Sequence, residues 1–89
     1  MGKYQVHRSD GNAQQIIAAW RRVGATVELI GRPTDALVGF RRVNYLFEIK
    51  TARGKLRASQ AAFLERWRGQ VCVVRSVSEA LRAIGAVNG

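Results

Sequence analysis

The sequence has few of the residues that build sulfur and metal sites. It contains one Cys, one His and one Pro among 89 residues. A zinc site made of cysteine and histidine needs several such ligands, so this class of protein is excluded. The single cysteine, Cys72, lies within the apolar run VCVV. This position favours a small buried side chain over a nucleophile.

Long apolar runs are also absent. No stretch approaches the roughly 18 to 20 apolar residues that a membrane-spanning helix requires, and the first residues, MGKYQVHRSDGN, lack the apolar core of a secretory signal. We therefore expect a cytoplasmic protein with no membrane-spanning segment. A chain this short forms one domain, over residues 1–89, with a modest core.

Acidic residues are scarce. The chain has 6 Asp and Glu against 15 Lys and Arg, which gives a net charge of +9. On so short a chain this charge indicates an anionic partner. Nucleic acid is the first candidate, and an acidic membrane surface is the second.

The first expected element is a helix over residues 12–23. Asn12 and Gln15 have the spacing of a capping box, and apolar residues then recur at helical spacing. Gly24 falls where a C-cap glycine ends a helix. The first helix thus carries one apolar face toward the core.

The rest of the chain alternates strand-like and helical segments. We expect strands over 25–30, 35–40, 45–50 and 70–76 and helices over 59–69 and 76–85. Ser59 is the expected N-cap of its helix. The run QVCVVRS is almost continuously apolar around its centre, which is typical of a strand buried on both faces. The order α-β-β-β-α-β-α predicts an α/β domain with a mixed sheet flanked by helices.

The hairpin around RRVN decides which polar side chains share a face. If the loop has an even number of residues and pairs Phe40 with Tyr45, then Asp35 lies across from Lys50. Because side chains alternate faces along a strand, Asp35, Glu48 and Lys50 then emerge on the same face. An odd loop without a compensating bulge would place Asp35 on the opposite face.

Asp35 and Glu48 suit a hard divalent cation. Magnesium is usually held by one or two carboxylates and keeps waters and substrate phosphate in its other positions. Lys50 can contact the attacking water or the phosphate and stabilise the charge that develops there. The backbone carbonyl of Ile49 can offer a further ligand. These groups are the minimum that hydrolysis of a phosphodiester requires.

Basic residues surround the candidate site along the chain. We expect contacts with DNA phosphates from Arg41, Arg42, Arg53, Lys55, Arg57, Arg66 and Arg68. Such contacts bind phosphate without reading sequence. An acid and a base two apart on a strand, taken alone, fit an exposed edge-strand charge pair. Their combination with Asp35 and with these basic positions favours the site.

The motif residues resemble a known family. RPTD followed by YLFEIK resembles the proline, Asp and Glu-x-Lys signature of the PD-(D/E)XK nuclease superfamily. The continuation KLRASQAAFLERWRGQVCVVRSVSEAL resembles the stand-alone VRR-NUC domains of phages and bacteria. The resemblance covers about residues 10–81 and implies a restriction-endonuclease-like core with Mg²⁺ or Mn²⁺. It also implies a homodimeric endonuclease that cuts branched DNA, such as Holliday junctions, in the cytoplasm of a bacterial or phage-infected cell.

The resemblance also implies residue roles. Asp35 and Glu48 correspond to metal ligands, Lys50 to the catalytic cation, and Gln60, on the helix after the motif, to a residue that supports the site. Gln60 shares a helical face with Phe63 and Trp67, which turns it toward the sheet. These aromatic residues, like Trp20, are expected in the core rather than as base-stacking platforms.

One feature of the family is missing from the first helix. Many relatives carry a Glu there near the metal, whereas this helix has no acidic residue. Asp10, Asn12 or Gln14 can stand in, although helix capping is the more ordinary role for Asp10 and Asn12. Two alternatives to a nuclease therefore stay open. They are a non-catalytic basic module that binds nucleic acid, and an accessory subunit whose basic face contacts a protein.

Overall fold

Four strands and three helices make up the described part of the chain. The computed structural model describes residues 11–86. Its elements are α1 (Ala13–Arg22), β1 (Thr26–Leu29), β2 (Ala36–Phe40), β3 (Val43–Ile49), α2 (Ala58–Arg66), β4 (Cys72–Val74) and α3 (Val77–Ala83). The predicted order of elements is confirmed. None of these helices is long and apolar enough to cross a membrane.

The strands form one mixed sheet in the order β1-β2-β3-β4. The first three strands are antiparallel, and β4 joins β3 in parallel after the crossover through α2. The prediction that β4 is buried on both faces is wrong. This strand has three residues, lies at the edge of the sheet, and leaves Cys72 and Val73 half-buried. An apolar run alone does not distinguish such an edge from a central strand.

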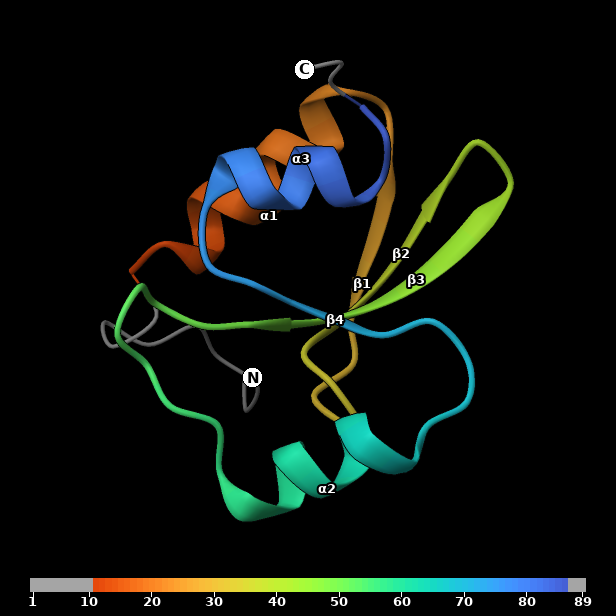
Figure 1. The fold of residues 1–89 in the computed structure, drawn as a ribbon. Coiled ribbons are helices and arrows are strands. Elements are labelled where there is room, and N and C mark those ends of the chain that lie inside the picture. Colours follow the sequence, from red (N-terminus) through yellow and green to blue (C-terminus); the bar gives the residue numbers. More distant parts are fainter. Residues whose placement is uncertain (1–10, 87–89) are drawn as a thin grey trace.

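The core lies between the sheet and the pair α1 and α3, while α2 lies on the opposite side (Figure 1). Trp20 is fully buried, as predicted, and its ring stacks on Phe47 with 4.7 Å between centroids. Its indole N–H donates to the carbonyl of Ala80 over 2.9 Å. A buried tryptophan needs such a partner. One side chain therefore joins α1 to the sheet and to α3.

The C-terminal end of α1 matches the prediction, and its N-terminal end does not. Gly24 has φ +101° and the chain closes in a Schellman motif, with the N–H of Gly24 donating to Arg21 and that of Ala25 to Trp20. The predicted capping box at the other end is wrong, because the Asn12 side chain makes no hydrogen bond to the first turn. It donates to carbonyl groups at the ends of β3 and β4 instead.

The bounds of α2 also differ from the prediction. The helix begins earlier, with Arg57 rather than Ser59 at the N-cap. The Gln60 side chain accepts a hydrogen bond from the Arg57 backbone N–H, which replaces the expected serine cap. The helix ends at Arg66, so Trp67 lies outside it in an extended conformation.

The β2–β3 hairpin closes with a two-residue turn instead of the predicted four-residue loop. Phe40 pairs with Val43, so the predicted partner Tyr45 is wrong by two residues. The even parity is confirmed, and a shift of two keeps every side chain on its face. Extending the register by one residue beyond the pair Ala36 and Phe47 places Asp35 across from Glu48 rather than Lys50.

The turn itself is occupied by Arg41 and Arg42, whose φ angles are 54° and 69°. Two-residue hairpin turns of this kind favour Asn-Gly, since both residues need positive φ. A side chain with a Cβ costs about 1 to 2 kcal/mol in this conformation. Arg41 gains some compensation, because its guanidinium lies 4.7 Å from the Phe40 ring centroid.

Replacing Arg42 with Gly is expected to stabilise the fold. Relief of the positive φ should raise the free energy of unfolding by about 0.5 to 1 kcal/mol, measured by urea denaturation at constant m-value. Arg22→Gly is the matched control, since Arg22 is an exposed arginine in helical conformation. Glycine should lower stability there. A lower unfolding midpoint for Arg42→Gly would show that the turn is not strained.

Candidate active site

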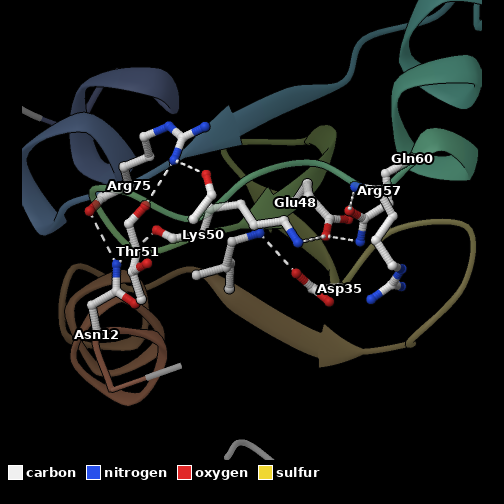
Figure 2. A network of polar contacts seen from close by, with 10 residues as sticks. Asn12, Asp35, Glu48, Lys50, Thr51, Arg57, Gln60 and Arg75 are labelled. Carbon is white, nitrogen blue, oxygen red and sulfur yellow. Dashed lines mark hydrogen bonds and ion pairs between the residues drawn. The ribbon is translucent and has the colours of Figure 1, made fainter. Parts of the chain in front are cut away.

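Two carboxylates meet at one end of the β2–β3 pair. Asp35 directly precedes β2, and Glu48 is the penultimate residue of β3. The Asp35 Oδ2 atom accepts a hydrogen bond of 2.8 Å from the Ile49 N–H. Both carboxylates line a cavity of about 350 Å³ between the sheet and α2. Figure 2 shows their side chains in the same polar network as Lys50 and Gln60.

Glu48 is a buried acid with two polar partners. It is 3% exposed, and its Oε2 atom accepts a hydrogen bond of 2.6 Å from Gln60 Nε2 and lies 3.6 Å from Lys50 Nζ. The pKa of Glu48 is raised from 4.5 to about 7, mainly by burial and secondly by the negative charge of Asp35. The ammonium of Lys50 acts in the opposite direction. The site thus destabilises the ionised form of this acid.

Gln60 links the start of α2 to Glu48. Its Oε1 atom accepts from the Arg57 backbone N–H over 2.8 Å, while its Nε2 atom donates to Glu48. A backbone N–H can only donate, so the amide oxygen must face Arg57 and the amide nitrogen must face the carboxylate. The helix start therefore fixes which group Gln60 presents to the site.

Lys50 leaves the end of β3 with its backbone held on both sides. Its N–H donates to the Val74 carbonyl over 3.0 Å, and its own carbonyl accepts from Asn12 Nδ2 over 2.9 Å. The side chain is 16% exposed and reaches Glu48. The position of the ammonium therefore depends on contacts with β4 and with the start of α1.

Arg75 fixes the loop that follows Lys50, a role that no motif in the sequence predicted. Its Nη1 atom donates to the carbonyls of Thr51 and Gly54, each over 2.7 Å. The Arg75 carbonyl accepts from Asn12 Nδ2 over 3.0 Å. Figure 2 shows Asn12 and Arg75 on the side of Lys50 away from Gln60. No spacing in the chain distinguishes Arg75 from the other arginines.

The basic residues fall into separate groups. Arg57 and Arg66 line the cavity, as does Arg32, which was not among the predicted DNA contacts. Arg32 could have been predicted near the site, because it directly precedes Pro33 in the turn that leads to Asp35. The remaining predicted DNA contacts do not line this cavity; they are Arg41, Arg42, Arg53, Lys55 and Arg68.

Distance from the cavity differs among these remaining residues. Arg53 and Lys55 lie in the loop after Lys50, whose backbone Arg75 holds, and Arg68 follows α2. Arg41 and Arg42 form the hairpin tip, which projects away from α2 (Figure 1). Five strand residues separate the tip from Asp35, a span of about 17 Å. The hairpin tip is thus a separate basic surface.

The candidates for the missing first-helix acid do not reach the cavity. Gln14 is exposed and lines a different hollow with Ile17 and Leu29. Asn12 binds backbone carbonyls beside Lys50 and does not line the cavity of the two carboxylates. Asp10 lies outside the described residues. The described residues therefore supply no third side-chain carboxylate there.

The donor set fits a magnesium-type cation rather than a metal caged by protein ligands. Within residues 11–86, no group of three His, Cys, Asp or Glu converges. Two carboxylates are sufficient for Mg²⁺, which keeps several waters. The hydrogen bonds and the ion pair described above use only one oxygen of each acid, Asp35 Oδ2 and Glu48 Oε2. Burial and the charge of Asp35 raise the pKa of Glu48, and a divalent cation would offset both effects.

Ile49 has the right orientation for its proposed carbonyl role. Its N–H points to Asp35, and the N–H and C=O of one strand residue point to the same side. The carbonyl therefore also faces the β2 side of β3, where Asp35 lies.

The chain has no match among protein-family models, curated proteins or solved structures. The structure establishes an α/β domain with a four-stranded mixed sheet and three helices. The resemblance to VRR-NUC domains stays a prediction that rests on the motif residues.

The stability of the metal-free protein should fall as pH rises through the pKa of Glu48. Between pH 4.5 and 7 the folded state binds more protons at Glu48 than the unfolded chain does. Glu48 therefore makes its full contribution to the free energy of unfolding below pH 4.5, and this contribution is lost as pH rises through 7. The side chain of Glu48→Gln stays neutral at every pH. The unfolding free energy of the variant minus that of the wild type should therefore increase by up to about 3 kcal/mol from pH 4.5 to 7. Urea denaturation in EDTA measures the difference, and a constant difference would contradict the raised pKa.

Arg75→Ala should release the loop at residues 51–57. Loss of the two hydrogen bonds made by Nη1 removes a charged donor worth about 1.5 to 3 kcal/mol, so trypsin should cut at Arg53 and Lys55 at least tenfold faster. Arg82→Ala is the matched control, because within residues 11–86 the Arg82 side chain donates only to Ser78 on its own helix. Equal cleavage rates in Arg75→Ala and the wild type would show that Arg75 does not hold the loop.

Proposed function

We propose that this chain is a metal-dependent endonuclease with a PD-(D/E)XK-type core. The observation that carries the proposal is the convergence of Asp35 and Glu48 in one cavity, with the Lys50 ammonium 3.6 Å from Glu48. Two acids placed together in a chain of net charge +9 are not explained by charge balance. They are explained by a divalent cation and a phosphodiester.

The residues of the site have distinct roles in this proposal. Asp35, Glu48 and the Ile49 carbonyl would hold Mg²⁺ or Mn²⁺, which when bound supplies an activated water and neutralises phosphate charge. Lys50 binds a phosphate oxygen and stabilises the negative charge that develops during hydrolysis. Gln60 keeps the Glu48 carboxylate oriented toward the cavity.

The protonation of Glu48 couples metal binding to pH. A ligating carboxylate must lose its proton, and the pKa of Glu48 is about 7 in the metal-free protein. Metal binding therefore releases protons, and metal affinity rises with pH through this range.

The surroundings of the cavity favour DNA as the substrate. Arg32, Arg57 and Arg66 line the same cavity as the two acids. Such residues position the phosphate backbone and carry no sequence information. The resemblance to stand-alone VRR-NUC domains supports a cytoplasmic homodimer that acts on branched DNA, such as Holliday junctions. Two subunits would then present two sites to one junction.

The absence of acidic residues from the first turn of α1 favours one alternative. A nuclease core without the third acid can persist as a non-catalytic module that binds nucleic acid. This module would bind DNA equally in EDTA and Mg²⁺ and would never cut it.

The test is incubation with linear, flap, splayed and four-way-junction DNAs in Mg²⁺, Mn²⁺ or EDTA. Asp35→Ala, Glu48→Ala and Lys50→Ala should each reduce cleavage at least 100-fold, since each removes a ligand or the charge that stabilises the reaction. DNA affinity in EDTA should change by less than about threefold, because Arg32, Arg57 and Arg66 at the cavity keep their contacts with the phosphate backbone in each variant.

The matched control is Glu28→Ala. Glu28 is an exposed acid of β1 that pairs with Leu37 and so shares the sheet face of Glu48. It should cut DNA at the wild-type rate. Metal-dependent cleavage that survives all three site substitutions would refute the proposed site, and binding without cleavage by the wild type would establish the non-catalytic alternative.

A further inference from the structure

Trp67 is exposed, contrary to the prediction that it lies in the core. It is 44% exposed, because α2 ends one residue earlier. The ring is nevertheless held in place. It stacks on Phe63 with 5.2 Å between centroids, and a Cβ at Gly69 would lie 2.8 Å from its Nε1 atom. A large apolar ring is thus fixed on the surface rather than left loose.

The ring borders a hollow on the sheet face opposite the core. The hollow measures about 300 Å³, and it is lined by Leu37, Asn44, Tyr45, Leu46, Trp67, Gly69 and Gln70. Leu37 and Leu46 pair across β2 and β3, and Leu37 is 38% exposed. The described residues therefore leave an apolar floor uncovered next to a fixed indole.

The hollow adjoins the candidate active site. Leu46 precedes Glu48 by two residues on β3, so their side chains share a face about 7 Å apart. Phe63 lines the cavity of the two acids and also supports Trp67. At about 3.4 Å per nucleotide in a stacked strand, the separation corresponds to one or two nucleotides.

Charge and shape indicate what occupies the hollow. Arg66 and Arg68 flank Trp67 in the chain, and Arg66 also lines the active-site cavity. A flat apolar surface bordered by cations fits a nucleobase whose phosphate is held beside it. Asn44 and Gln70 also border the hollow. The Gln70 Oε1 atom accepts from the Leu46 N–H over 2.9 Å, so its Nε2 group and the Asn44 amide can meet the polar edge of a base.

We propose that Trp67 and this hollow stack an unpaired nucleobase one or two nucleotides from the phosphodiester at Asp35 and Glu48. The protein would then select DNA with unpaired bases over fully paired duplex. The role of this base in cleavage rests on the proposed nuclease function. The binding of the base does not, and it can be measured in EDTA.

The test compares oligothymidine with an oligonucleotide of equal length that carries abasic sites. Stacking on one aromatic side chain is expected to give the wild type about tenfold tighter binding to oligothymidine than to the abasic strand. Trp67→Ala should lose this tenfold preference and leave abasic binding unchanged. Trp67→Phe should keep most of it. Val23→Ala, an exposed apolar residue at the end of α1, is the control without effect.

Fluorescence gives a second readout. The chain has two tryptophans, and Trp20 is fully buried. In Trp20→Phe the emission comes from Trp67, and it should be quenched by oligothymidine and not by the abasic strand.

Two results would overturn the proposal. One is an equal loss of affinity for both strands in Trp67→Ala, because the indole would then contact no base. The other is a Trp67→Ala variant that sediments as a monomer where the wild type sediments as a dimer, and that keeps the preference for oligothymidine. This face would then be an interface between copies. A wild type that prefers oligothymidine through Trp67 and never cuts DNA would refute the nuclease and support the base site.

Discussion

The pairing of β2 with β3 across a two-residue turn is the constraint on which the site depends. It brings Asp35 next to Glu48 and gives both acids the same face of the sheet. A slip of one residue would turn Glu48 into the core and expose Phe47. Phe47 is fully buried against Trp20, so the register that fills the core is the register that assembles the two acids. Packing and site chemistry therefore specify one arrangement.

The burial of Glu48 is stabilised by contacts from two directions. Gln60 approaches from α2, and Lys50 approaches from the end of β3. A buried ionised carboxylate without partners would cost several kcal/mol. Glu48 can therefore be ionised in the folded protein only because these contacts are present. The neighbouring charge of Asp35 still opposes ionisation. This arrangement stores an unfavourable interaction that a bound cation would relieve, which is a common property of functional sites.

The sequence predicted those features that depend on periodicity and missed those that depend on distant contacts. Alternation along the strands was enough to place Asp35 and Glu48 on one face. The turn length was wrong because nothing in RRVN indicates that two arginines adopt positive φ. The exposure of Trp67 was missed because its helical spacing from Phe63 continues past the residue where α2 ends. Arg75 was missed because its partners, Thr51 and Gly54, lie more than 20 residues away.

The hydrogen bonds of Asn12 have a consequence for the order of assembly. The acids, Lys50 and Gln60 all come from one segment of the chain, which a hairpin and a short helix can bring together early. Asn12 reaches Lys50 and Arg75 across 38 and 63 residues, respectively. Contacts at such separations require the closure of long loops, whose entropy cost makes them form late in folding. The carboxylates can therefore meet before the lysine and its loop are fixed, and the site becomes complete only when the start of α1 has packed against the ends of β3 and β4.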